Sequence, residues 1–222
     1  MTDEAPAKRS LCARCLRPSS TCICGWIRPT AHQVEVLVLQ HPREVARAKG
    51  TARLLQLSLR HCRLAVGEEF LPAELQALLD GSGPHETARS GHRQALLLYP
   101  DTPQDQALGL LSPPALPALL RDPQQLLLVV LDGSWRESRK MLYRNPLLQR
   151  LPRLALRDFP ASKYLIRKAH EPHQLSTLEA TCGALAQLEG GAQKFQPLLQ
   201  GFDGFVNQLL GYALHGRQAG RR

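Results

Sequence analysis

The sequence predicts an α/β fold with a mostly parallel sheet and flanking helices. Two observations carry this prediction. Short apolar runs, the clearest being LLLVVL at residues 126–131, are typical of strands buried on both faces of a sheet. These runs alternate along the chain with segments of helical spacing, an order that favours parallel β-α-β units. A chain of 222 residues is long enough for one sizeable core.

Five segments are expected to be strands, because each is a short apolar run bounded by polar or turn-forming residues. They cover residues 34–39, 62–66, 95–99, 126–131 and 154–156. The third run stops at a proline, which ends regular strand pairing.

The expected helices lie between these strands and after the last one. Residues 43–60 carry an apolar stripe at helical spacing, and residues 72–80 start at a proline, which suits the first turn of a helix. Further helices are expected at 135–145, 176–189 and 204–215, with a short one near 115–121 in the otherwise irregular, proline-rich stretch 100–123.

The charge of the chain is strongly positive. Lys and Arg number 28 against 19 Asp and Glu, which gives a formal charge of +9 at pH 7. No apolar run approaches the roughly 18 residues of a membrane span, and the first residues do not resemble a signal peptide. These features exclude a membrane protein and a fibrous protein. We expect a cytoplasmic protein with an anionic partner, although a basic surface can also serve solubility alone.

Four cysteines near the N-terminus form the sharpest motif. Cys12, Cys15, Cys22 and Cys24 follow the spacing C-x2-C-x6-C-x-C. Clustered cysteines in a chain with no export signal favour a metal site, and four thiolates match a closed, structural Zn²⁺ site. The alternatives are four unrelated thiols or two disulfides. The predicted organisation is therefore a zinc knuckle over residues 1–30 and an α/β domain over residues 31–222.

Polar residues follow the predicted strands at the sheet edge where ligands bind in such folds. After LLLVVL comes Asp132-Gly133-Ser134-Trp135. Asp132 can be a general base or an N-terminal helix cap, and the sequence does not separate the two.

A capping box is predicted at Ser176 and Glu179, which fit the S-x-x-E pattern. The amides of this helix start can also hold a carboxylate or a phosphate.

Most of the positive charge lies directly after Asp132. Residues 136–168 hold ten basic and two acidic residues, an excess of +8. This stretch is predicted to bind RNA phosphates, with tyrosines that can stack on bases, rather than to be only a solvated helix face. The candidate RNA-binding residues are Arg136, Arg139, Lys140, Arg144, Lys163, Tyr164, Arg167 and Lys168.

Taken together, these motifs resemble the DTW-domain family. The resemblance rests on the cysteine motif with Pro18 inside it, and on HPRE, TAR, LLYP, LDGSW, SKYLIRK, LSTLEA and FDGFVNQ, which begin at residues 41, 51, 97, 131, 162, 175 and 202. It covers nearly the whole chain in order. Ser134 stands where the family signature Asp-x-Thr-Trp has threonine, which keeps the hydroxyl. Gly50 stands where the family often has asparagine.

The resemblance implies a SPOUT-like fold and a tRNA-uridine aminocarboxypropyltransferase. Such an enzyme moves the 3-amino-3-carboxypropyl group of S-adenosylmethionine to N3 of a uridine, expected at tRNA position 47 in the variable loop, and releases methylthioadenosine. We expect a monomer, with structural zinc. The alternatives are a SPOUT-like, S-adenosylmethionine-dependent RNA methyltransferase and a non-catalytic zinc protein that binds RNA.

The resemblance also implies roles for individual residues. Asp132 is the expected general base, and Ser134 and Trp135 are expected to fix the turn and to contact the substrate. The expected S-adenosylmethionine-binding residues are His41, Arg53, Leu98, Tyr99, Pro100, Leu131, Leu175, Ser176, Thr177 and Glu179.

Overall fold

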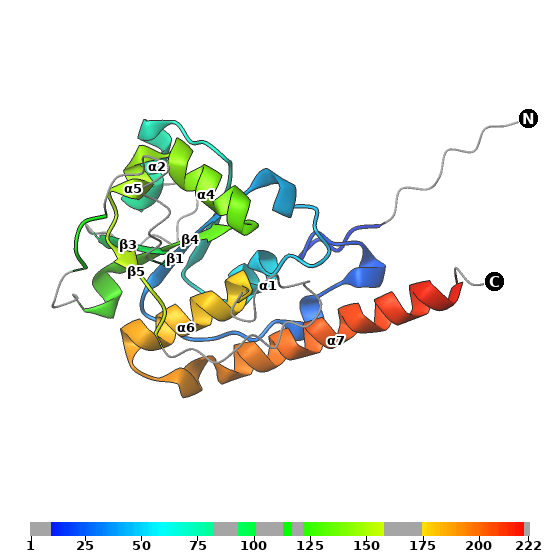
Figure 1. The fold of residues 1–222 in the computed structure, drawn as a ribbon. Helices are drawn as coiled ribbons and strands as arrows, with labels where there is room; N and C mark the ends of the chain where they lie inside the picture. The colour runs from blue at the N-terminus through cyan, green and yellow to red at the C-terminus, as the bar shows by residue number, and fades with distance from the viewer. Residues whose placement is uncertain (1–9, 82–92, 101–112, 117–121, 158–174, 220–222) are drawn as a thin grey trace, which may run out of the picture.

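The fold is a five-stranded, all-parallel sheet with helices on both faces (Figure 1). The computed structural model describes residues 10–81, 93–100, 113–116, 122–157 and 175–219. Within these residues the strand order is β2-β1-β4-β3-β5. The strands are β1 (Glu35–Gln40), β2 (Cys62–Val66), β3 (Gln94–Leu98), β4 (Leu126–Asp132) and β5 (Arg153–Leu154). The α/β class with a parallel sheet is therefore confirmed.

Six α-helices and several 3-10 turns connect the described strands. The helices are α1 (Ala52–Ser58), α2 (Pro72–Leu79), α4 (Trp135–Arg144), α5 (Pro146–Gln149), α6 (Thr177–Glu189) and α7 (Gln196–Ala219). The 3-10 turns are η1 (Ser19–Thr21), η2 (Cys24–Trp26), η3 (Pro42–Glu44), η4 (Pro123–Gln125) and η5 (Ala192–Phe195). None of the described helices is long and apolar enough to cross a membrane.

The sheet separates two apolar cores. Figure 1 shows α2, α4 and α5 on one face of the sheet and α1, α6 and α7 on the other. Side chains alternate along β4, so Leu128 and Val130 enter the core beneath α1, α6 and α7, while Leu127 and Val129 enter the core beneath α2, α4 and α5. A strand buried on both faces explains why the run LLLVVL has no polar position before Asp132.

The segment after β1 differs from its prediction. The helix expected over residues 43–60 is wrong as one element, because η3 ends at Glu44 and α1 begins only at Ala52. Arg17 of the cysteine segment donates to the Ala48 and Gly50 carbonyl oxygens at 2.6 and 2.8 Å. These two carbonyls accept hydrogen bonds from the guanidinium in place of the backbone amides of a continuous helix, so the segment between η3 and α1 is irregular.

Other element boundaries also differ from expectation. The last helix runs over Gln196–Ala219 rather than 204–215, and the last strand is only Arg153–Leu154. Residues 117–121 of the helix expected near 115–121 lie outside the described residues, and residues 113–116 are not helical.

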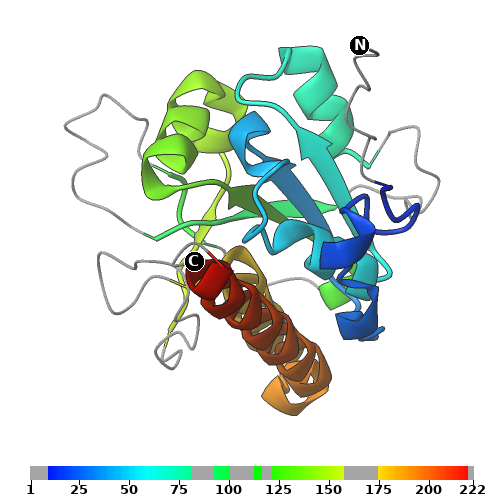
Figure 2. The same ribbon diagram turned by 90° about the vertical axis from the view of Figure 1, so that its right-hand side faces the viewer.

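The cysteine segment packs on the C-terminal helix. Cys15 and Ile23 are fully buried and share the larger core with Phe205 of α7. The Gln208 amide donates to the Cys22 carbonyl at 3.1 Å, and the Tyr212 hydroxyl donates to the Ser20 carbonyl at 2.6 Å. Figures 1 and 2 show this N-terminal segment, in dark blue, next to the α/β layers. The described part of residues 1–30 thus shares one core with the rest of the chain.

Candidate functional site

Asp132 lies buried at the carboxyl edge of the sheet, where β4 ends. Its carboxylate accepts two hydrogen bonds, from Gln40 Nε2 to Oδ2 at 2.8 Å and from Thr177 Oγ1 to Oδ1 at 2.6 Å. The residue is only 4% exposed. The side chain therefore joins β1, β4 and the start of α6. It does not cap the following helix, so of the two predicted roles for Asp132 the helix cap is wrong.

Ser134 is the cap of α4. Its hydroxyl accepts from the Glu137 amide at 3.3 Å and donates to Glu137 Oε2 at 2.7 Å, and the same carboxylate oxygen accepts from the Ser134 amide at 2.8 Å. This is a complete capping box. Burial opposes ionisation of Glu137, but the hydrogen bonds from Ser134 outweigh it and hold the pKa of Glu137 below its ordinary value. Ser134 thus fixes the turn after Asp132, while its predicted contact with substrate stays a prediction.

Trp135 forms an aromatic stack with Tyr99, which follows β3. The ring centroids are 5.3 Å apart and the planes meet at 15°. Tyr99 is buried, whereas Trp135 is 43% exposed. The Arg153 guanidinium lies 5.1 Å from the centre of the Tyr99 ring and supports the stack as a cation–π contact. Beside Asp132 the structure therefore presents a flat, partly exposed indole.

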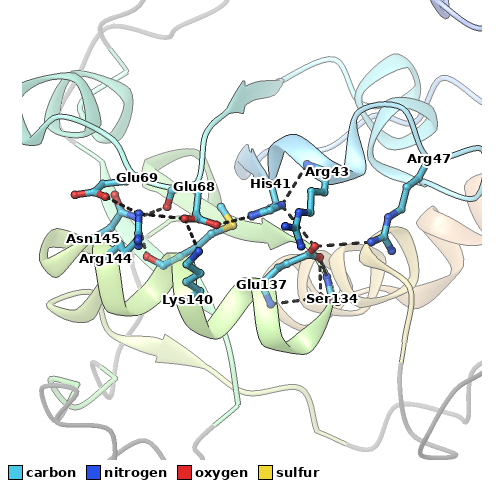
Figure 3. Close-up of polar contacts among 11 residues, drawn as sticks. His41, Arg43, Arg47, Glu68, Glu69, Ser134, Glu137, Lys140, Arg144 and Asn145 are labelled. Carbon is cyan, nitrogen blue, oxygen red and sulfur yellow. Dashed lines mark hydrogen bonds and ion pairs between the residues drawn. The ribbon is translucent and has the colours of Figure 1, made fainter.

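His41 follows the first strand and lies between two acidic side chains, Glu68 and Glu137 (Figure 3). The His41 amide donates to the Asp132 carbonyl at 2.8 Å. Nδ1 accepts from the Arg43 amide at 3.2 Å, so the ring proton resides on Nε2, which donates to Glu68 at 2.9 Å. On its other side, Nδ1 lies 3.7 Å from Glu137. His41, a predicted cofactor-binding residue, is thus buried in a hydrogen-bond network that positions the Asp132 backbone.

Glu68 also neutralises part of the basic face of α4. Lys140 lies 3.0 Å and Arg144 3.2 Å from its Oε1, and Arg144 also pairs with Glu69 at 3.1 Å. The hydrogen bonds from His41 and Lys140 lower the pKa of Glu68 to about 2. Two cations of the predicted RNA-binding set are therefore paired with acidic residues that come from the segment after β2 (Figure 3). Their predicted contact with RNA stays a prediction.

The start of α6 is a second capping box, as predicted. The Ser176 amide donates to the Glu179 carboxylate at 2.8 Å, and the Glu179 amide donates to the Ser176 hydroxyl at 3.2 Å. The next amide, of Leu178, donates to the Thr51 hydroxyl at 3.3 Å. Three amides at the start of α6 thus donate hydrogen bonds within the chain. This is the capping role predicted from the sequence, rather than the binding of a carboxylate or a phosphate.

The predicted residues gather at one sheet edge with few exceptions. Hydrogen bonds join Asp132 to His41 and to Thr177, and the aromatic stack joins Tyr99 to Trp135, which follows Asp132 closely in the chain. The neighbouring predictions lie beside them in sequence, at Leu98, Pro100, Leu131, Leu175, Ser176 and Glu179.

Arg53 is an exception. Its guanidinium donates to Gln56 at 2.7 Å and to the Arg14 carbonyl at 2.6 Å, so it ties α1 to the cysteine segment.

Four predicted RNA-binding residues lie outside the described residues. They are Lys163, Tyr164, Arg167 and Lys168. Of the remaining four, Arg136 is exposed and Arg139 is half-buried.

A cavity in the described part of the chain lies beside β5 rather than at Asp132. Arg153, Arg157, Gln187 and Pro113 belong to its lining. Arg153 links this cavity to the aromatic stack, since its guanidinium also contacts the Tyr99 ring.

The four cysteines near the N-terminus lie close enough together to hold a metal ion. Their sulfur atoms all lie within 4.8 Å of one another, with Cys12 and Cys24 3.6 Å apart and Cys15 and Cys22 3.8 Å apart. A tetrahedral zinc with Zn–S bonds of about 2.3 Å requires sulfur separations of about 3.8 Å. Disulfide sulfurs would lie about 2.05 Å apart, and these cysteines are free thiols, so the disulfide alternative is wrong.

The thiols in this cluster have widely different pKa values. Backbone amides of Cys15 and Arg14 lower the pKa of the Cys12 thiol to about 6. Burial and the neighbouring sulfur atoms raise the pKa of Cys24 to about 12. A divalent cation would offset the repulsion that four thiolates at this spacing exert on one another, and four sulfur ligands would leave no open coordination position. The residues therefore fit a structural zinc ion.

The chain thus combines a parallel α/β sheet, a buried carboxylate at its carboxyl edge and a four-cysteine knuckle. The DTW domain profile matches residues 9–210, so the chain belongs to the DTW domain family. It is 31% identical over 208 residues to tRNA-uridine aminocarboxypropyltransferase 2 of Drosophila melanogaster, covering 89% of this chain and 74% of that protein. It is 28% identical to the Mus musculus protein of that name, covering 84% of this chain and 59% of the relative. No solved structure matches the chain.

Proposed function

We propose that this chain is a tRNA-uridine aminocarboxypropyltransferase that uses S-adenosylmethionine as donor and modifies N3 of a uridine, at position 47 in the variable loop. Membership of the DTW domain family and the names of its relatives support the enzyme class. The observation that carries the chemistry is the buried Asp132 carboxylate, held from two sides beside an exposed indole. As an enzyme on tRNA it would act in the cytoplasm, and we propose that it acts as a monomer.

Asp132 is proposed as the general base. Bound S-adenosylmethionine supplies an electrophilic carbon next to a sulfonium, with methylthioadenosine as the leaving group. As uridine N3 forms its bond to that carbon, the N3 proton passes to Asp132 and the electron pair of the broken S–C bond stays on sulfur. Each Asp132 oxygen accepts one hydrogen bond in the structure and has a second lone pair that can receive the proton.

The residues around Asp132 would orient the reactants. Gln40 and Thr177 hold the carboxylate in one rotamer, which keeps the base in position during proton transfer. The exposed indole of Trp135 gives a surface on which an unstacked uridine or the adenine of the donor can lie. The segments of His41, Tyr99 and Ser176 are proposed to line the donor pocket.

The cysteine knuckle has a structural role in this proposal. Zinc held by Cys12, Cys15, Cys22 and Cys24 would fix the N-terminal segment on α7, because Cys15 is buried in the shared core. No step of the transfer needs a metal ligand position.

The test is incubation of the protein with S-adenosylmethionine and unmodified tRNA, followed by nucleoside mass spectrometry. The proposal expects an aminocarboxypropyl adduct on uridine and release of methylthioadenosine. A methyl adduct with S-adenosylhomocysteine would support the RNA methyltransferase instead. Stable tRNA binding with no adduct would support the non-catalytic zinc protein. Asp132→Asn serves as the matched control, because it keeps the side-chain size and removes the base.

A further inference from the structure

A second basic surface lies between Asp132 and the cysteine knuckle. It is carried by the segment of residues 42–50, which leaves the site directly after His41. Arg43, Arg47 and Lys49 are exposed on this segment. Its one acidic residue, Glu44, is buried and lies 3.1 Å from Arg47. The outward charge of the segment is therefore positive.

The cysteine knuckle extends this surface. Arg17 donates to the carbonyls of Ala48 and Gly50, so the knuckle lies against the segment. Residues 10–30 contain three arginines and no acidic residue. Arg14 is exposed, and within the described residues its hydrogen bonds are made by its backbone, through its carbonyl to Arg53 and its amide to the Cys12 thiol. Neither Arg14 nor Arg43 forms an ion pair with the part of the chain that the structure describes.

Leu16 at the tip of the knuckle is a strained and exposed apolar residue. Its φ of 60° lies in the left-handed region, which leucine rarely adopts, and it is 62% exposed. A glycine would take this conformation with less strain, and the core gains little from a side chain that faces solvent. The backbone is held in this turn by the hydrogen bond from the Leu16 amide to the Cys12 carbonyl. The choice of an exposed leucine at a position that suits glycine favours a contact of this side chain outside the chain.

We infer that Arg14, Leu16, Arg43, Arg47 and Lys49, here called the knuckle-side surface, contact the backbone of the tRNA whose uridine reaches Asp132. This inference rests on the proposed function and assigns a substrate contact to a surface other than α4. The surface begins at the site, because the His41 amide donates to the Asp132 carbonyl. Arginines and a lysine suit phosphate oxygens, and an exposed leucine suits the apolar face of a ribose or base.

Each basic surface contains cations that are already paired within the chain. On α4, Lys140 and Arg144 are paired with Glu68. On the knuckle-side surface, Arg47 is paired with Glu44 and Glu137, whereas Arg14 and Arg43 form no ion pair within the described residues. A cation that has no partner within the protein contributes fully to the salt dependence of RNA binding when it contacts a phosphate. Replacing Arg14 and Arg43 should therefore change the salt dependence of tRNA affinity more than replacing a paired cation.

The test measures tRNA affinity against salt concentration for Arg14→Gln/Arg43→Gln. Each phosphate contact contributes roughly 0.7–0.9 to the slope of log affinity against log salt, so two lost contacts lower the slope by about 1.4–1.8. At 0.1 M salt this corresponds to roughly 25- to 60-fold weaker binding. The matched control is Arg60→Gln/Lys194→Gln, which removes the same charge from exposed positions just before β2 and in η5, outside both basic surfaces.

A second variant separates function from folding. Leu16→Gly relieves the left-handed strain, so its melting temperature should equal or exceed that of the wild type, while tRNA binding weakens about fivefold through the lost apolar contact. If the variant is at least as stable as the wild type and still binds tRNA less tightly, misfolding does not explain the weaker binding.

The outcomes also distinguish this inference from the proposed function. If the wild type binds and modifies tRNA while the Arg14/Arg43 variant keeps the wild-type slope, the knuckle-side surface is refuted and the proposed function stands. An equal loss in the Arg60/Lys194 control would also refute it, because the effect would be one of net charge. If the wild type neither binds nor modifies tRNA, both proposals fail.

Discussion

Replacement of Gly204 by alanine tests how the knuckle is held on α7. A Cβ at this position would lie 2.2 and 2.3 Å from the ring atoms Cζ3 and Cε3 of Trp26, closer than any real side-chain contact. The indole has to move by more than 1 Å, roughly the difference from ordinary van der Waals contact. Its Nε1–H is hydrogen-bonded to Gln208, and Trp26 closes the turn that contains Cys24.

The expected change in the free energy of unfolding is the sum of three contributions, one stabilising and two destabilising. Glycine to alanine inside a helix stabilises by about 1 kcal/mol, overpacking costs about 1–3 kcal/mol, and losing the Trp26 hydrogen bond costs about 1 kcal/mol. The net expectation for Gly204→Ala is a loss of about 1–3 kcal/mol, or a fall in melting temperature of about 2–12 °C for a chain of this size. In the same helix, Gly211 has nothing within 4 Å of its would-be Cβ. Gly211→Ala should therefore raise the melting temperature by about 1–4 °C.

The assay is thermal unfolding followed by circular dichroism, with zinc content measured on the same samples. In a Trp26→Ala background the steric conflict is gone, and Gly204→Ala should then stabilise the protein as Gly211→Ala does. Equal stabilisation by both alanines in the wild-type background would refute the docking of Trp26 on α7.

Further expectations concern the site, the metal and pH. Asp132→Asn keeps an oxygen that accepts from Thr177 but replaces the oxygen that accepts from Gln40 by an amide nitrogen, so the melting temperature should fall by about 2–4 °C, the effect of one lost hydrogen bond. Its tRNA affinity should stay normal while turnover falls about 10²- to 10⁴-fold, and near-normal turnover would remove Asp132 as the base. Cys15→Ser should lower both bound zinc and melting temperature, and unchanged zinc by metal analysis would contradict the site. Glu68→Gln removes the carboxylate shared by two α4 cations, so tRNA affinity at low salt should rise if α4 contacts RNA, and a flat response would argue against that contact. Burial lowers the pKa of His32 below 6.5, so its contribution to stability is complete above pH 6.5 and is lost as the pH falls toward the folded-state pKa. Urea denaturation of His32→Asn should show a smaller loss of stability between about pH 7.5 and 5.5, whereas an unchanged pH dependence would count against this assignment.

Local patterns in the sequence were enough to predict the sheet and the capping box at Ser176. LLLVVL is a strand because an apolar run of that length fits a position buried on two faces, and Ser176 caps a helix because Glu179 stands three residues later. Strand-end reasoning also located Asp132, since parallel strands bring their carboxyl ends to one edge. The same reasoning, applied to Gln40 at the end of the neighbouring strand, would have found the partner of Asp132.

Contacts between distant segments could not be predicted in this way. The pairing of Glu68 with Lys140 depends on how the loop after β2 lies over α4, and no local pattern encodes that geometry. The break in the helix expected over residues 43–60 likewise depends on Arg17, which binds carbonyls that a regular helix would otherwise use. In both cases tertiary contacts override a correct local periodicity.

The structure gives a physical reason for motifs that have no obvious catalytic chemistry. A buried carboxylate needs hydrogen-bond donors, and they come from separate segments: Gln40 beside HPRE, and Thr177 within LSTLEA. Thr51, the first residue of TAR, bonds the Leu178 amide and so fixes the helix that carries Thr177. Residues of these separate segments thus converge on one side chain and hold it in place. A variant of Thr51 or Thr177 is therefore expected to act through the position of Asp132, in the same direction as a variant of Asp132 itself.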